Sequence, residues 1–265
     1  MSGDIAIIAG EGRLAAELSA RLPGAPVYAL QGFAPPVPAT EFRLERLVPF
    51  LDHLAEGGIS RVVFGGAIRR PRLDPEAFDP RTAQLVPRML AAMQTGDDAA
   101  LRVLLAIFEE FELTICGLEE VAPDLVPGPG YLAGHPGPDD ERDAARAAEI
   151  LATTGPLDIG QGCVVAGGLC LAIETLPGTE AMLSFAALHQ ELRLKPRSGL
   201  LYKAPKPGQE RRIDLPAIGP DTVDQAAAAG LAGVAWQAGG VVLLDRDEAI
   251  RRATSHGLFL WARAA

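Results

Sequence analysis

The sequence has few cysteines and no long uncharged apolar run. Its three cysteines, Cys116, Cys163 and Cys170, form no Cys-x-x-Cys pair, and three thiols cannot build a disulfide framework. We therefore expect a protein of a reducing compartment. No apolar run reaches the roughly 18 residues of a membrane-spanning helix, and the opening Met-Ser-Gly-Asp is unlike a signal peptide. These absences exclude disulfide-rich toxins and integral membrane proteins, and they lead us to expect a cytoplasmic location.

Positive charge is also scarce. The 265 residues include 24 Lys+Arg and 34 Asp+Glu, a formal charge of −10. A protein that coats nucleic acid needs a basic surface, so we expect no nucleic-acid partner. Walker A, H-E-x-x-H and G-x-S-x-G motifs are all missing. Apolar residues, in contrast, make up 48 % of the chain, which is enough for a large core.

The spacing of apolar residues predicts an α/β protein of two domains. In the first half, short apolar runs alternate with helical patterns, which is typical of a Rossmann-like, mostly parallel sheet. The expected strands are 4–9, 26–30, 61–64 and 112–116, and the expected helices are 13–22, 44–55, 82–93 and 97–108. Prolines and glycines then crowd residues 122–138. We predict an N-terminal domain at 1–130, a flexible linker at 131–138, and a smaller C-terminal α/β catalytic domain at 139–265.

A glycine turn follows the first predicted strand. Residues 10–15 fit the pattern G-x-G-x-x-A, in which Gly10 and Gly12 would let a phosphate approach the start of a helix. A nicotinamide enzyme would place an acidic residue at the end of the second strand, but no carboxylate appears before Glu41. A phosphate or nucleotide site and a tight turn without ligand both remain open.

Carboxylates occur at two further helix or strand ends. Asp97 and Asp98 begin a predicted helix, where acidic residues are common for structural reasons alone. Glu174 ends an apolar run, and Gly178 and Thr179 begin the helix that follows it. Oxygen ligands and backbone N–H groups at such an edge suit Mg²⁺ and phosphate, although a strand exit and a helix start explain them equally well.

The most informative stretch is basic. Residues 193–212 contain seven Lys or Arg and one acid, in a chain whose overall charge is negative. Prolines stiffen the part that holds Lys203, Lys206 and Arg211, and a cleft of fixed donors suits a polyphosphate. Asp214 follows directly and is a candidate for holding a metal ion or a water. A solvated basic loop is the alternative.

Several of these motifs together resemble a known family. They are Ile8–Gly12, Gly96–Asp98, Leu157–Gln161, Ala172–Glu174, Gly178–Leu183, Lys203–Pro207 with Gln209–Glu210, Asp214–Pro216, Ala229–Gly233 and Leu244–Arg246. Nearly end to end, the chain is similar to the UDP-2,3-diacylglucosamine pyrophosphatases of the LpxI type, which act in lipid A biosynthesis. The family's usual Gly-Thr-Asp is here Gly-Thr-Glu, with Glu180 in the third place.

The resemblance implies a function and a set of site residues. It implies metal-dependent hydrolysis of UDP-2,3-diacylglucosamine to UMP and 2,3-diacylglucosamine 1-phosphate, in a crevice between two hinged domains. The cofactor would be Mg²⁺ or another divalent ion such as Mn²⁺. The expected catalytic residues are Asp214, Glu174, Lys203 and Lys206; the expected substrate-binding residues are Gly10, Gly12, Gly178, Thr179, Gln209 and Arg211; the expected metal ligands are Asp214, Glu174, Asp97 and Asp98.

The same resemblance implies partners and a location. The partner would be a small lipid nucleotide-sugar, with transient contact at the inner face of the inner membrane, and a homodimer is an expected assembly. Two other functions stay open: a nucleotide- or phosphate-binding sensor without catalysis, and a nicotinamide-dependent oxidoreductase.

Overall fold

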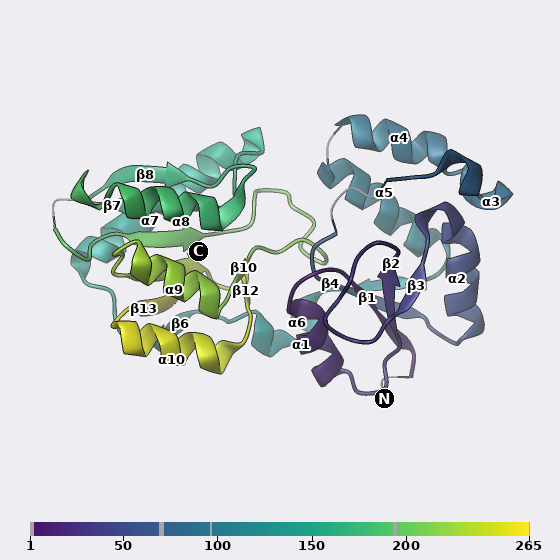
Figure 1. Cartoon of the computed structure of the whole chain (residues 1–265), viewed down its shortest axis with the longest axis horizontal. Coiled ribbons are helices and arrows are strands. Elements are labelled where there is room, and N and C mark those ends of the chain that lie inside the picture. Colours follow the sequence, from purple (N-terminus) through teal and green to yellow (C-terminus); the bar gives the residue numbers. More distant parts are fainter. Residues whose placement is uncertain (1–2, 69–71, 96, 193–194, 265) are drawn as a thin grey trace. The chain divides into compact units, whose positions relative to one another are not determined.

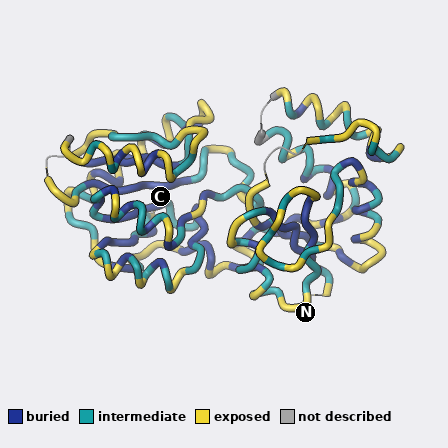
Figure 2. The backbone as a smooth tube through the Cα atoms, in the orientation of Figure 1, coloured by how far each residue is buried: buried dark blue, intermediate teal, exposed yellow. Residues whose placement is uncertain are grey.

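The chain forms two compact units. The computed structural model describes residues 3–68, 72–95, 97–192 and 195–264. The units are Met1–Ala122 and Pro123–Ala265, so the C-terminal unit, predicted to be the smaller one, is the longer by 143 residues to 122. In each unit the central strands are among the most deeply buried segments (Figure 2). The predicted α/β class with a parallel-sheet domain and a second domain is confirmed.

The N-terminal unit contains a five-stranded sheet with the order β3-β2-β1-β4-β5, and all its strands are parallel. The strands are β1 (Ile5–Ala9), β2 (Val27–Leu30), β3 (Thr40–Phe42), β4 (Arg61–Gly65) and β5 (Thr114–Cys116). Every residue of β1 is buried, as expected for a central strand covered on both faces. The four predicted strands are confirmed within two residues at each end. The edge strand β3 was not predicted, because its three residues are too few to show a pattern.

Helices connect these strands (Figure 1). They are α1 (Leu14–Arg21), α2 (Leu47–Glu56), α3 (Pro80–Ala83), α4 (Val86–Thr95), α5 (Asp97–Glu110) and α6 (Leu118–Val121). The helix predicted to begin at Leu44 starts with a 3₁₀ turn, Leu44–Arg46, and becomes α-helical at Leu47. Pro49 then lies in the first turn, where a missing N–H costs no helical hydrogen bond.

The C-terminal unit is built on a mixed six-stranded sheet with the order β6-β13-β11-β9-β7-β8. The strands are β6 (Gly130–Ala133), β7 (Gly162–Ala166), β8 (Leu169–Ile173), β9 (Leu200–Lys203), β11 (Gly233–Gln237) and β13 (Phe259–Arg263). Three of them, β9, β11 and β13, are parallel, whereas β6 and the β7–β8 hairpin run antiparallel to their neighbours. β10 (Ala217–Ile218) and β12 (Val242–Leu243) form a separate parallel pair. β10 begins three residues after Asp214 in the sequence.

Helices cover both faces of this sheet. The helices are α7 (Pro138–Thr154), α8 (Gly178–Leu188), α9 (Pro220–Ala228) and α10 (Arg246–His256). Alternate residues of the strands divide between two cores: Val164 and Leu201 pack with α8, α9 and α10, whereas Cys163 and Tyr202 pack with α7. This alternation is the period of two expected of a strand buried on both faces.

Two predictions for this half are corrected. The linker at 131–138 is occupied by most of β6 and by the first residue of α7, so proline and glycine here mark the ends of regular elements. Lys203, predicted in a basic loop, lies in β9 and is buried. Among the described residues, no helix combines the length and apolar character needed to cross a membrane.

Candidate active site

Most of the predicted polar residues lie at one end of the strands of the six-stranded sheet, the end at which β9 finishes. β9 ends there at Lys203, and because Gly162 pairs with Lys203, the antiparallel β7 begins at the same edge. The Glu174 N–H donates to the Gly162 carbonyl at 2.8 Å, which places Glu174 beside them. The carboxyl ends of parallel strands are where α/β proteins place ligands.

On the face covered by α8, three side chains form what we call the buried cluster: Glu174, Thr179 and Lys203. The Lys203 ammonium donates to Thr179 Oγ1 at 2.7 Å, and the Thr179 hydroxyl donates to Glu174 Oε1 at 2.7 Å. Lys203 Nζ lies 3.6 Å from Glu174 Oε2, an ion-pair distance too long for a hydrogen bond. Glu174 Oε2 is buried and has no hydrogen-bond donor among the described residues.

Burial dominates the electrostatics of the buried cluster. Lys203 is 5 % exposed, and the loss of hydration lowers the pKa of its ammonium below the ordinary value, while the charge of Glu174 acts in the opposite direction. Lys203 also reaches the carbonyl of Ala217 at 3.5 Å. The cluster therefore ties together the start of α8, the end of β9 and the segment that follows Asp214.

Glycines make room for Glu174. A Cβ on Gly162 would lie 2.7 Å from Glu174 Oε2, and a Cβ on Gly160 would lie 2.1 Å from the Glu174 carbonyl oxygen. Gly160 also has φ +58°, a conformation that favours glycine. Packing against Glu174 accounts for both glycines of the Asp-Ile-Gly-Gln-Gly motif.

On the opposite face, a cavity of 280 Å³ opens between α7 and the segment after β9; we call it the basic cavity. It is lined by Ala148, Leu151, Ala152, Tyr202, Ala204, Pro205, Lys206, Pro207, Gly208, Gln209, Arg211 and Gln237. Three predicted site residues, Lys206, Gln209 and Arg211, therefore lie together. Tyr202 and Gln237 were missed, because the sequence does not reveal which strand ends meet at one cavity.

Polar contacts hold the residues of the basic cavity in place. Lys206 forms an ion pair with Asp158, a residue with φ +59°, and the Arg211 guanidinium donates to the carbonyl of Gly239. The Gln209 side chain accepts from the Lys206 N–H at 2.8 Å and donates to Asp214. Gln209 thus fixes the orientation of the Asp214 carboxylate. Asp158 was not predicted as a site residue, although its motif carries part of the resemblance.

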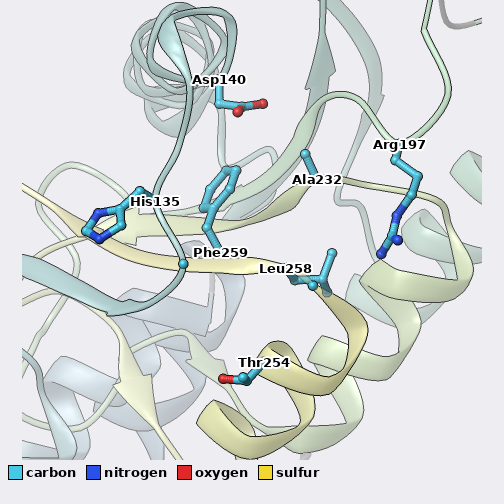
Figure 3. A pocket seen from close by; sticks show the side chains of 9 residues that line it. His135, Asp140, Arg197, Ala232, Thr254, Leu258 and Phe259 are labelled. Carbon is cyan, nitrogen blue, oxygen red and sulfur yellow. The ribbon is translucent and has the colours of Figure 1, made fainter.

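A larger cavity of 490 Å³ lies at the opposite ends of β11 and β13 (Figure 3). Its polar side chains carry mixed charge and several serve the fold: Asp140 accepts from the Gly137 N–H at 2.9 Å, and Arg197 donates to the carbonyl of His256. Burial, opposed by the hydrogen bond from Gly137, raises the pKa of Asp140. The described lining of the basic cavity, in contrast, has two cationic side chains, Lys206 and Arg211, and no carboxylate.

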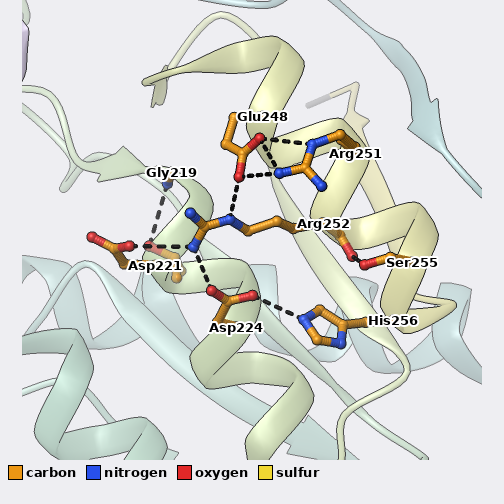
Figure 4. A network of polar contacts seen from close by, with 9 residues as sticks. Gly219, Asp221, Asp224, Glu248, Arg251, Arg252, Ser255 and His256 are labelled. Carbon is orange, nitrogen blue, oxygen red and sulfur yellow. Dashed lines mark hydrogen bonds and ion pairs between the residues drawn. The ribbon is translucent and has the colours of Figure 1, made fainter.

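A polar network also joins α9 and α10 on the outside of the C-terminal unit (Figure 4). Asp224 accepts from His256 Nε2 at 2.8 Å and forms an ion pair with Arg252, which also contacts Glu248 at 2.6 Å. These side chains are partly exposed, so we assign the network to helix packing.

The remaining predicted site residues lie elsewhere or serve other roles. Gly10 and Gly12 belong to the N-terminal unit; a Cβ on Gly10 would lie 2.6 Å from the Ala67 carbonyl oxygen, so backbone packing alone accounts for that glycine. Gly178 has φ +86° at the first position of α8. Asp97 and Asp98 begin α5, and their side chains lie outside the described part of the chain.

The described residues cover only part of the predicted metal site, since the side chains of Asp97 and Asp98 lie outside them. No three His, Cys, Asp or Glu side chains among them are arranged to hold a metal ion. Glu174 faces an ammonium group and accepts from Thr179, a setting that suits the counter-ion of Lys203 better than a ligand of a divalent cation. A requirement for Mg²⁺ or Mn²⁺ therefore stays a prediction.

Family models match both halves of the chain. The model of the LpxI N-terminal domain matches residues 4–125, and that of the LpxI C-terminal domain matches residues 129–261. The chain belongs to the LpxI family. Its two family domains meet within a few residues of the boundary between the compact units. The buried cluster and the basic cavity both lie in the LpxI C-terminal domain.

A curated relative in the LpxI family extends the match over the full length. The chain is 37 % identical over 268 aligned positions to the UDP-2,3-diacylglucosamine pyrophosphatase LpxI of Caulobacter vibrioides. The alignment covers 97 % of this chain and 96 % of that protein. The similarity therefore includes both units.

Proposed function

We propose that the protein hydrolyses the pyrophosphate bond of UDP-2,3-diacylglucosamine, giving UMP and 2,3-diacylglucosamine 1-phosphate in lipid A biosynthesis. The observation that carries the proposal is the 37 % identity, over nearly all of both chains, to a relative of that activity. In the reaction, one water adds across the P–O–P bridge. The water oxygen bonds to one phosphorus while the bond from that phosphorus to the bridging oxygen breaks. The bridging oxygen leaves on the other phosphate, the protons of the water pass to the products or to solvent, and both products are phosphomonoesters.

The basic cavity supports this chemistry. Lys206 and Arg211 line it and would neutralise the diphosphate, whose negative charge must be stabilised in the transition state. Asp214, oriented by Gln209, would position the attacking water. Lys203 is occupied within the buried cluster, so we propose that it supports the position of the Asp214 segment through Ala217.

Metal dependence, location and assembly belong to the same proposal. We retain Mg²⁺ or Mn²⁺ as the proposed cofactor, with Asp214 as its proposed ligand in the C-terminal unit. A cytoplasmic protein that touches the membrane surface to collect its lipid substrate fits the proposed reaction. A homodimer also remains a proposal.

The test is the release of UMP from UDP-2,3-diacylglucosamine in reactions that contain Mg²⁺ or EDTA, and chromatography measures the UMP. The wild-type protein should release UMP with Mg²⁺, and Asp214→Asn should be slower by about 10²-fold or more while keeping its fold by circular dichroism. Rates equal to wild type in that variant would remove Asp214 from the mechanism. Tight nucleotide binding without UMP release would favour the sensor, and hydride exchange with a nicotinamide cofactor would favour the oxidoreductase.

A further inference from the structure

Helix α8 exposes apolar side chains that lie outside the core. One face of the helix, with Met182, Leu183 and Ala186, packs into the core. The outer face exposes Phe185 by 51 % and Leu188 by 76 %. A helix that is apolar on both faces is normally buried on both, and a contiguous exposed apolar surface commonly marks a binding site.

Three exposed residues of α8 lie on one side of the helix. Ala181, Phe185 and Leu188 follow one another at intervals of four and three residues, so they share one side of α8. Leu176, fully exposed, lies just before the helix and two residues after Glu174. We call Leu176, Phe185 and Leu188 the apolar track.

The length of the apolar track suits one hydrocarbon chain. α8 packs on β7 and β8 (Figure 1). Its N-terminus lies at the end of the strands where the buried cluster is found, since Thr179 donates to Glu174. Residues 178–188 span roughly 15 Å at the helical rise of 1.5 Å per residue. A fatty acyl chain fills about half of a bilayer core of roughly 30 Å, which is a similar length.

The charge of this surface favours an acyl chain over a membrane. Within residues 176–188 the one ionisable side chain is that of Glu180, and the whole chain carries −10. Peripheral helices that bind anionic lipid surfaces carry Lys and Arg on their polar face, and residues 176–188 contain neither. An uncharged chain of a bound substrate needs no such cations.

We propose that the apolar track binds one fatty acyl chain of the substrate and so contributes to selection for long-chain diacyl substrates. The inference rests on the proposed function, because it takes the diacyl nucleotide-sugar as the ligand. It adds a binding surface outside the polar site, at the point where Leu176 adjoins Glu174.

The first test compares two substrates with one headgroup, UDP-2,3-diacylglucosamine with long chains and the 2,3-diacetyl analogue. The double variant Phe185→Gln/Leu188→Gln should lower kcat/KM at least tenfold for the long-chain substrate and less than twofold for the diacetyl analogue. Tyr131→Gln is the matched control: Tyr131 is 49 % exposed on β6, the opposite edge strand, and should leave both values unchanged. Equal loss on both substrates, or no loss, would overturn the proposal.

The second test needs no turnover. A long-chain substrate analogue with a photoreactive diazirine in an acyl chain is irradiated with the protein, and the labelled peptide is identified by mass spectrometry. Label within residues 176–188 supports the apolar track even if UMP release fails, and label confined to other peptides overturns it. Binding to neutral phosphatidylcholine vesicles that falls in the double variant, without any chain-length effect on kcat/KM, would overturn the acyl site in favour of membrane contact.

Discussion

Two lysines three residues apart have very different surroundings. Lys203 ends β9 inside the buried cluster, with its ammonium on Thr179 and near Glu174. Lys206 lines the basic cavity and pairs with Asp158, whose side chain is highly exposed. Two lysines of one motif therefore have different roles: Lys203 stabilises the packing on one face of the sheet, and Lys206 lines an open cavity on the other face. The two lysines differ in burial, because Lys203 is the last residue of β9 and points into the core, whereas Lys206 lies beyond the end of the strand.

The comparison predicts its largest effect at Lys203. Lys203→Met keeps the hydrocarbon stem but leaves the Glu174 carboxylate buried without its cation, so we expect a loss of about 3–5 kcal/mol in the free energy of unfolding. Urea unfolding of the full-length protein would measure this change in the free energy of unfolding. Lys206→Met, which removes an exposed pair, should cost about 0–1 kcal/mol. Similar losses in the two variants would contradict the comparison.

The next effect concerns activity and not stability. Gln209→Ala removes the hydrogen bond that Gln209 donates to the Asp214 carboxylate, and we expect kcat to fall about tenfold to a hundredfold, as is common when a partner that orients a functional group is lost. The melting temperature should change little, because the side chain lies at an open cavity. Gln190→Ala, which removes a bond to the Ala228 carbonyl on the surface, is the control and should keep full activity. A large fall in stability with normal kcat would place Gln209 in the fold instead.

A glycine tests the packing of the buried cluster. In Gly162→Ala the new methyl would stand 2.7 Å from Glu174 Oε2 and 3.4 Å from Met182 Cε, so the carboxylate must move, at a cost of about 1–3 kcal/mol. Thermal unfolding measures the change. Gly128→Ala is the control, because nothing lies within 4 Å of its Cβ position, and we expect no loss there. An unchanged Gly162→Ala protein would mean that Glu174 is not held where the structure places it.

The smallest effect calibrates exposed ion pairs. Burial alone would raise the pKa of Asp224, but hydrogen bonds from His256 and Arg252 outweigh it and lower the pKa below the ordinary 3.8. The stability that this adds is present above pH 3.8 and is lost as the pH falls through the lower, folded-state value. Asp224→Asn should therefore cost up to about 1 kcal/mol near pH 6 and progressively less toward pH 3. Urea unfolding between pH 3 and pH 6 measures this loss. Glu149→Gln, which changes an exposed carboxylate on α7, is the surface control. A loss of stability in Asp224→Asn that grows on acidification would contradict the lowered pKa of Asp224.

Much of the architecture could be predicted from local patterns. The buried runs of the first half became β1, β2, β4 and β5. An uninterrupted apolar run is typical of a parallel strand that helices cover on both faces. Strand β9 was not predicted, since Lys203 at its end belongs to a basic, proline-rich stretch. Strand β6 was not predicted either, because it lies among prolines and glycines that are typical of linkers.

The candidate site divides in the same way. The motifs were sufficient to select Glu174, Thr179, Lys203, Gln209 and Asp214 as residues of interest. Their partners were not predictable, because Lys203 meets Thr179 across 24 positions of sequence and Lys206 meets Asp158 across 48. Which residue becomes a counter-ion and which faces a cavity depends on the pairing of β7 with β9.

The sequence by itself determined the α/β class, the two-domain organisation and the similarity to the LpxI family, since periodicity and motifs are local properties of the chain. Tertiary structure alone decided that Lys203 is buried, that Lys206 and Arg211 line one cavity with Tyr202 and Gln237, and that α8 exposes a second apolar face. The physical reason is that hydration, and with it the behaviour of a charged or apolar side chain, depends on neighbours that strand pairing and helix packing bring from distant parts of the sequence.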